Sequence, residues 1–156
     1  MDPFIPKEMV FRTLEDEYAR QMDVTTVYDE ESGKMMGIIV PFRGDNRLLI
    51  TVINDEMGFV ISTLAKGLMP NDDAVNASLS KINELNSNFK RGCFTSKKEH
   101  GITFDTFLHC APGGMVDTTS LFNEVKLGPQ MFEIYIDEIM KIVKENVRTD
   151  EYVIQE

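Results

Sequence analysis

Two cysteines and two histidines are the side chains in this chain most suited to nucleophilic, acid–base or metal chemistry. His100 falls in a predicted turn and His109 near a predicted strand end, and no third ligand stands at metal-site spacing from them. Around Cys93 and Cys110, no nucleophile, base and orienting group can be placed together. These residues therefore predict neither a metal site nor a catalytic centre.

The motifs that mark nucleotide or acyl chemistry are also missing from the sequence. There is no Gly-Lys-Ser/Thr phosphate loop, no Gly-x-Gly-x-x-Gly fingerprint and no Gly-x-Ser-x-Gly elbow. Acidic pairs at 72–73 and 55–56 suit a helix cap and a turn, because calcium loops need alternating oxygen ligands over a longer span. We therefore expect no catalytic residue, no metal and no cofactor, and predict that the chain is not an enzyme.

Hydrophobic periodicity predicts the elements that position these side chains. Apolar residues at helical spacing indicate helices over about 6–21, 71–89 and 117–146, and Gly128-Pro129 is expected to interrupt the last one. β-branched and alternating segments predict strands over 24–28, 35–43, 47–54, 59–64, 93–97 and 102–110.

The two cysteines are expected to remain free thiols. If the last two strands pair around a turn at 97–101, Phe94 lies opposite Phe104. In that register Cys93 points to one face of the sheet and Cys110 to the other. The two sulfurs therefore cannot approach to disulfide distance without a change of register.

The order of elements predicts one α+β domain over residues 1–148, with 149–156 as a flexible tail. Short Gly- and Asp-rich turns join the strands between 35 and 64, which favours an antiparallel meander. The predicted order is α-β-β-β-α-β-β-α, and the segment 24–28 is a candidate fourth strand before the second helix. We expect the helices to cover mainly one face of the antiparallel sheet.

Charge and hydropathy exclude several classes of partner. The chain has 26 acidic and 16 basic residues, which gives a net charge of −10. Because nucleic-acid binding requires a basic surface, we expect no nucleic-acid partner. The N-terminal residues lack the apolar run of a signal peptide, and no segment approaches the ~20 apolar residues that span a bilayer. These features predict a cytoplasmic protein without a membrane partner.

The predicted strands carry large apolar residues on both faces, whereas an antiparallel sheet with one wet face alternates cleanly. Leu49 and Ile53 fall on one such face, and Ile134 lies among the charged residues of the terminal helix. Apolar surface of this kind marks subunit or ligand interfaces. Leu49, Ile53 and Ile134 are therefore our candidate partner-binding residues. Alternatively, the terminal helix covers the second face or the sheet curls over it.

Several motifs support a family resemblance. They are the helix end Ile82-Asn83-Glu84-Leu85-Asn86, the following Gly92-Cys93-Phe94, and the strand from Gly101 to Leu108. From Asn71 to Val143 the chain resembles the YbjN-like bacterial domain, also labelled a sensory transduction regulator. That resemblance implies a fold similar to the type III secretion chaperones. Those are small, acidic, cytoplasmic homodimers that hold a partly unfolded client on apolar grooves.

The sequence thus predicts a non-catalytic protein-binding module, chaperone-like or regulatory. It would form a homodimer and capture an apolar segment of a protein or peptide client. The alternative is a small-ligand sensor with a pocket between the sheet and the terminal helix. A buried polar cluster facing a cavity would favour the sensor, and the sequence shows no such cluster.

Overall fold

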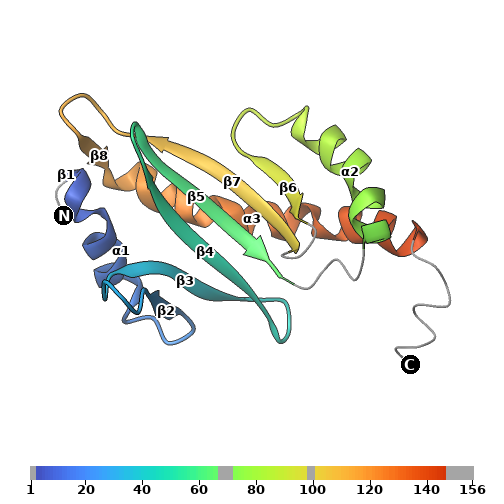
Figure 1. Cartoon of the computed structure of the whole chain (residues 1–156), viewed down its shortest axis with the longest axis horizontal. Helices are drawn as coiled ribbons and strands as arrows, with labels where there is room; N and C mark the ends of the chain where they lie inside the picture. Colours follow the sequence, from blue (N-terminus) through green and yellow to red (C-terminus); the bar gives the residue numbers. More distant parts are fainter. Residues whose placement is uncertain (1–2, 67–71, 98–100, 147–156) are drawn as a thin grey trace.

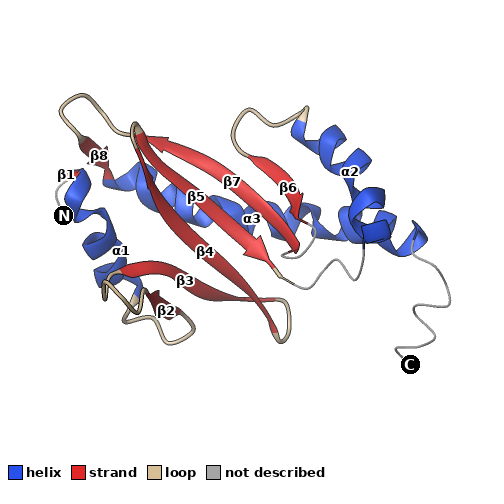
Figure 2. Cartoon of the chain, in the orientation of Figure 1, coloured by secondary structure: helices blue, strands red, loops and turns tan. Residues whose placement is uncertain are grey.

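A six-stranded antiparallel sheet forms the centre of the computed structural model, which describes residues 3–66, 72–97 and 101–146. The strands lie in the order β2-β3-β4-β5-β7-β6 across this sheet (Figure 1 and Figure 2). They span Thr25–Tyr28 (β2), Met35–Phe42 (β3), Asn46–Asp55 (β4), Gly58–Ala65 (β5), Cys93–Lys97 (β6) and Gly101–His109 (β7). For this sheet the predicted order α-β-β-β-α-β-β-α was one strand short, and the candidate strand 24–28 supplies the missing one, because it forms β2 and pairs along the edge of β3.

Local turn chemistry makes β3, β4 and β5 sequential neighbours. After β3, Arg43 and Gly44 both adopt positive φ, at 34° and 64°. After β4, the Asp55 carboxylate accepts a hydrogen bond of 2.8 Å from the Glu56 amide, and Asp55 pairs with Gly58. Connections this short join only antiparallel strands, so the predicted meander is confirmed.

The hairpin of β6 and β7 has the predicted register. Phe94 pairs with Phe104, and both Cys93 and Cys110 are free thiols, as expected. The Asn86 side chain fastens this hairpin to the preceding helix. Its amide donates to the Phe94 carbonyl and its oxygen accepts from the Phe94 amide, each at 2.8 Å.

Three α-helices pack on the sheet: α1 (Val10–Tyr18), α2 (Asp72–Asn86) and α3 (Thr118–Asn146). In Figure 1, α3 runs behind the sheet with α1 and α2 toward its two ends, and no described helix crosses the front. A 3₁₀ turn at Lys7–Met9, labelled η1, precedes α1, so this helix begins later than predicted. The predicted α+β class, with helices packed on an antiparallel sheet, is confirmed.

The prediction that Gly128-Pro129 interrupts the last helix is wrong, because α3 continues through both residues. A proline disfavours the helical conformation of the preceding residue partly by a clash with its Cβ, and Gly128 has none. Pro129 cannot donate a hydrogen bond to the Val125 carbonyl. We attribute the tolerance of this loss to packing, since both halves of α3 bury side chains against the sheet.

Buried side chains form two main apolar clusters, and α3 contributes to both of them. The first lies under α1 and includes Val10, Leu14, Ile38, Ile50, Phe59, Leu121 and Val125. The second lies under α2 and includes Leu48, Ile82, Phe94, Phe104, Phe132, Ile136 and Ile139. The long helix therefore joins the two ends of the sheet through a shared core.

A small second sheet, absent from the sequence prediction, closes the end of the molecule near α1. Strand β1 (Phe4–Pro6) pairs antiparallel with β8 (Met115–Asp117). The Thr118 amide donates a hydrogen bond of 3.0 Å to the Pro3 carbonyl. This pairing holds the N-terminal segment against the start of α3.

Strand β3 departs from the alternation that its sequence predicts. Met35 is buried with Ile38 in the cluster under α1, whereas Met36 is exposed, although strict alternation would place Met36 and Ile38 on the same face. The β2–β3 register shifts between Val27 and Tyr28. A bulge of this kind re-aims the side chains beside it, which explains the exchange.

Candidate binding sites

The face of the sheet opposite the helices, called here the helix-free face, carries large apolar side chains from four strands. Cross-strand pairing arranges them in two rows. The first row is Ile39, Leu49 and Leu64, and the second is Ile53, Val60 and Phe107. None of the six belongs to the buried clusters beneath the helices.

A polar row separates the two apolar rows of the helix-free face. It consists of Thr51, Ser62 and Asp105, which pair across β4, β5 and β7. One Asp105 oxygen lies 3.4 Å from the Thr103 hydroxyl, while the other is buried without a hydrogen-bond partner among the described residues. This face therefore combines apolar surface with a polar row in which one carboxylate oxygen is buried without a partner among the described residues.

The structure brings two of the three predicted partner-binding residues together. Leu49 is half-buried and Ile53 is 52% exposed, and both lie on the helix-free face of β4. Ile134 is 61% exposed on α3, which covers the other face of the sheet. The strand register shows that Val60 and Leu64 extend the surface around Leu49 and Ile53.

On the helix-covered side, a buried polar seam separates the two apolar clusters. The seam consists of Thr63 on β5, Thr106 on β7 and Glu124 on α3, each no more than 6% exposed. Glu124 forms an ion pair with Arg91, whose side chain is largely exposed. Neither threonine hydroxyl has a hydrogen-bond partner among the described residues. The seam joins three elements distant in sequence, so no local pattern predicts it.

The helix α3 approaches the sheet closely at this seam. Gly128 faces Thr63 so closely that a Cβ added to the glycine would lie 1.9 Å from the threonine hydroxyl oxygen. Gly92 is similarly confined, because an added Cβ would lie 2.5 Å from the Phe104 ring. Two glycines thus allow the helix and the β6 connection to approach the sheet.

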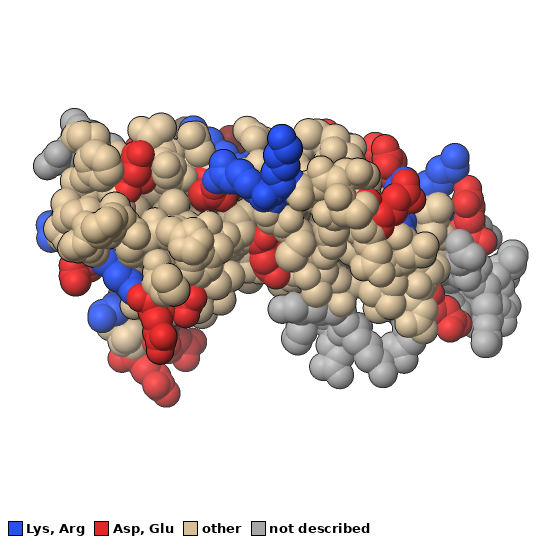
Figure 3. Space-filling view, turned by 90° about the horizontal axis from the view of Figure 1, so that it is seen from above, with Lys and Arg blue, Asp and Glu red and all other residues tan. Residues whose placement is uncertain are grey.

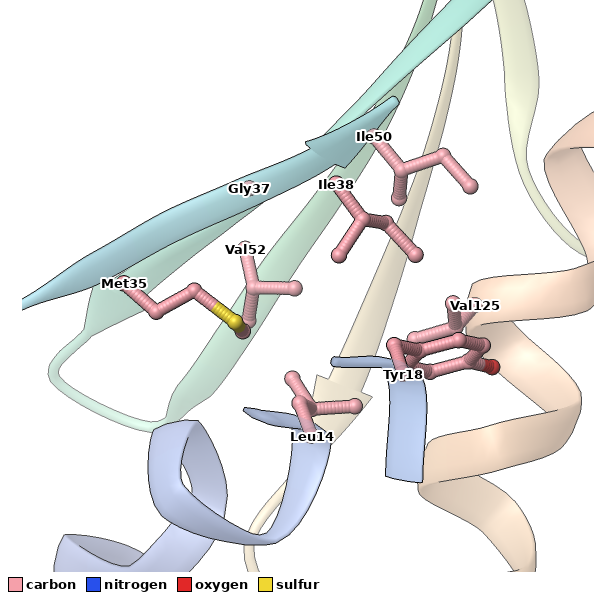
Figure 4. A pocket seen from close by; sticks show the side chains of 8 residues that line it. All are labelled: Leu14, Tyr18, Met35, Gly37, Ile38, Ile50, Val52 and Val125. Atoms are coloured by element: carbon pink, nitrogen blue, oxygen red, sulfur yellow. The ribbon is translucent and has the colours of Figure 1, made fainter. Parts of the chain in front are cut away.

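A pocket of about 300 Å³ opens between the sheet and α3. Strands β3 and β4 supply an apolar floor through Ile38, Val40, Pro41 and Ile50. The helices supply Tyr18, Val125, Lys126, Pro129 and Gln130. A smaller inner void of about 10 Å³ shares four of these residues, Tyr18, Ile38, Ile50 and Val125. Figure 4 shows the inner void enclosed by side chains of α1, β3, β4 and α3.

Tyr18 is the polar residue common to the pocket and the inner void. Its hydroxyl is buried and has no hydrogen-bond partner among the described residues, and Figure 4 shows it directed toward α3. Desolvation by burial, with a smaller effect of nearby Glu17, raises the Tyr18 pKa to about 12. The hydroxyl therefore keeps its proton at neutral pH and can donate a hydrogen bond.

Ion pairs join α3 to the rest of the fold. Arg43, after β3, contacts Asp137 at 2.6 Å and Glu133 at 3.1 Å. The hydrogen bonds that its guanidinium donates to Glu133, and to a lesser degree to Asp137, raise the Arg43 pKa. Lys81 on α2 lies 3.3 Å from Glu138 on α3. Seen from above, a basic group near the middle lies beside acidic side chains, further charged side chains lie toward the two ends, and uncharged surface separates them (Figure 3).

The residues suited to chemistry do not form a site in the described part of the chain. His109 is exposed at the end of β7. His100 lies outside the described residues, and so does the predicted tail over 149–156. Cys93 is exposed and Cys110 packs against the cluster under α1. Within 3–66, 72–97 and 101–146, no three metal-ligating side chains group together and no helix is long and apolar enough to cross a membrane.

Comparison with protein-family models finds none that matches the chain. A search of curated proteins finds no matching sequence. The resemblance to the YbjN-like domain therefore rests on the sequence motifs quoted above, and the α+β fold rests on the structure.

Proposed function

We propose that this protein is a non-catalytic binding module that holds an apolar segment of a partner protein on its helix-free face. The observation that supports the proposal is the placement of all three helices on the other side of the sheet. The two apolar rows consequently have no cover from any described helix. Contiguous exposed apolar surface on a soluble domain usually serves an interface.

The pattern on this face suggests what it binds. A segment that presents apolar side chains on both sides of a polar one would match the two apolar rows and the row of Thr51, Ser62 and Asp105 between them. Each large side chain that becomes fully buried contributes roughly 1.5–3 kcal/mol. The edge strands β2 and β6 offer backbone groups for strand addition as a further contribution.

We also propose that the protein is a homodimer with a chaperone-like or regulatory role. This part of the proposal rests on the resemblance to the YbjN-like domain and, through it, to the type III secretion chaperones. Light scattering over a dilution series tests it first. A stable dimer that becomes monomeric on Ile53→Asp substitution would indicate that a second copy occupies the helix-free face.

The exposed Cys93 provides a native handle for testing the binding surface. Cys93 pairs with Asp105 at the polar row of the helix-free face. A photo-reactive benzophenone attached to this thiol should crosslink a partner segment bound there. Ile53→Asp and Leu49→Asp should each reduce the crosslinked yield at least tenfold, the equivalent of ~1.4 kcal/mol of lost binding.

Ile134→Asp is the matched control, because Ile134 is equally apolar and exposed but lies on α3. Circular dichroism shows whether each variant folds, and the highly exposed Ile53 keeps the test valid if Leu49→Asp unfolds. If the Ile134 substitution abolishes crosslinking and the two β4 substitutions do not, the binding surface is α3 and the proposal is wrong.

A further inference from the structure

We propose that the pocket between β3, β4 and α3 binds a small monocarboxylate with an aliphatic or aromatic body. The pocket lies between the sheet and the terminal helix, and its volume of about 300 Å³ is near the lower end for small-molecule sites. This site is separate from the helix-free face, and its occupant does not depend on the partner proposed there.

The walls of the pocket divide into an apolar side and a polar side. The strand residues Ile38, Val40 and Ile50 are all aliphatic, so the floor suits a hydrocarbon body. The polar groups come from the helices, with Lys126 and Gln130 one turn apart on the same side of α3. A ligand would therefore lay its apolar part on the sheet and direct its head group toward the helices.

A carboxylate fits the polar side best. Lys126 carries a positive charge at the pocket, with no carboxylate at salt-bridge distance among the described residues. By contrast, Arg43, Lys81 and Arg91 are each neutralised by an acidic residue of α3. An ammonium and an anionic ligand group form a stronger hydrogen bond than two neutral groups do.

Tyr18 supplies a second donor at the inner end of the pocket. Its buried hydroxyl lacks a partner within the described residues and keeps its proton at neutral pH. A buried donor without a partner destabilises the empty site, and a ligand oxygen that accepts from it removes that penalty. The inner void of about 10 Å³ beside Tyr18 shows that packing here is incomplete.

Octanoate and its uncharged analogue octan-1-ol are suitable probes, titrated into the full chain by isothermal calorimetry at neutral pH. We expect saturable binding of one octanoate per chain and binding of octan-1-ol about tenfold weaker. Lys126→Met should weaken octanoate binding about tenfold and leave octan-1-ol binding unchanged. Val40→Trp, which fills the pocket, should abolish binding of both probes.

Lys141→Met is the matched control on the same helix, because Lys141 is exposed and does not line the pocket. Ile53→Asp controls for probe binding on the helix-free face, and neither control should change the octanoate affinity. Three results would overturn the proposal: no saturable octanoate binding, equal affinity for the two probes, or loss of octanoate binding in Ile53→Asp. Lys126→Met is a surface substitution, so the test remains decisive if Val40→Trp fails to fold.

Discussion

Replacing Gly128 by alanine tests how closely α3 packs on the sheet. In an ordinary helix interior this change stabilises a protein by ~1 kcal/mol, since glycine is the poorer helix former. At position 128 that gain is smaller, because an alanine Cβ also meets the ring of Pro129. The structure predicts the opposite sign. An added Cβ would lie 1.9 Å from the Thr63 hydroxyl oxygen and 2.5 Å from the Thr63 Cβ.

The magnitude follows from these distances. Non-bonded carbon atoms prefer a separation of ~3.5–4 Å, so the two Cβ atoms would be about 1 Å too close. Rotation of the Thr63 side chain can move its hydroxyl but not its Cβ, so the helix or the strand must shift. Overpacking of this kind destabilises by about 1–3 kcal/mol. Taking the upper value and subtracting the propensity gain, we expect a net loss of about 2 kcal/mol.

Urea unfolding followed by circular dichroism measures this change, with the midpoint shifted and the slope unchanged. Asn123→Ala is the matched control, because Asn123 is exposed on the same helix and gains only helix propensity, roughly 0.5 kcal/mol. Combining Gly128→Ala with Thr63→Ala removes the contact between the new Cβ and the Thr63 hydroxyl. The free energy of unfolding of the double variant should then be about 1 kcal/mol higher than the sum of the two single changes predicts. A Gly128→Ala protein as stable as the wild type, or more stable, would refute close packing of α3 on β5.

Two further predictions concern buried polar groups. Arg91→Ala should destabilise the protein by about 3 kcal/mol, because it leaves the buried Glu124 carboxylate unpaired, and adding Glu124→Gln should restore most of the loss in urea unfolding. Persistence of the full loss in the double variant would show that Arg91 acts through packing instead. Burial raises the Tyr18 pKa from its ordinary value of 10.0 to about 12. The stability that the protonated hydroxyl contributes is therefore fully present below pH 10 and is lost as the pH rises from 10 toward 12. Tyr18→Phe should flatten this alkaline decline in thermal melts, and an unchanged decline would contradict a buried hydroxyl.

Much of the sheet follows from local sequence. Short turns and alternating side chains are sufficient to predict the β3–β4–β5 meander and the pairing of Phe94 with Phe104. The errors occur where distant packing overrides a local rule. Pro129 lies inside α3, whose two halves both bury side chains against the sheet, and β1 forms because β8 pairs with it from across the chain. A bulge, which alternation does not reveal, exchanges Met35 and Met36.

The candidate sites differ in how far the sequence anticipates them. Leu49 and Ile53 are recognisable as a second apolar face because side chains two residues apart point to the same side of a strand. A pocket between the sheet and the terminal helix is the alternative expectation from the sequence, but its lining residues and the polar seam are not recognisable, since each combines side chains from three or more elements. Tyr18, Ile38 and Val125 meet around one void although a long stretch of chain separates them.

The sequence by itself determined the antiparallel strands, their two-sided apolar character and the acidic net charge, because each depends only on residue type and local spacing. Only the tertiary structure decided which face the helices cover. A strand that is apolar on both sides gives helices no local reason to choose one. The choice depends on long-range packing, including the approach of Gly128 to Thr63 and the large side chains that α3 buries in both clusters. That packing leaves Leu49 and Ile53 on the helix-free face and forms the pocket beside Tyr18.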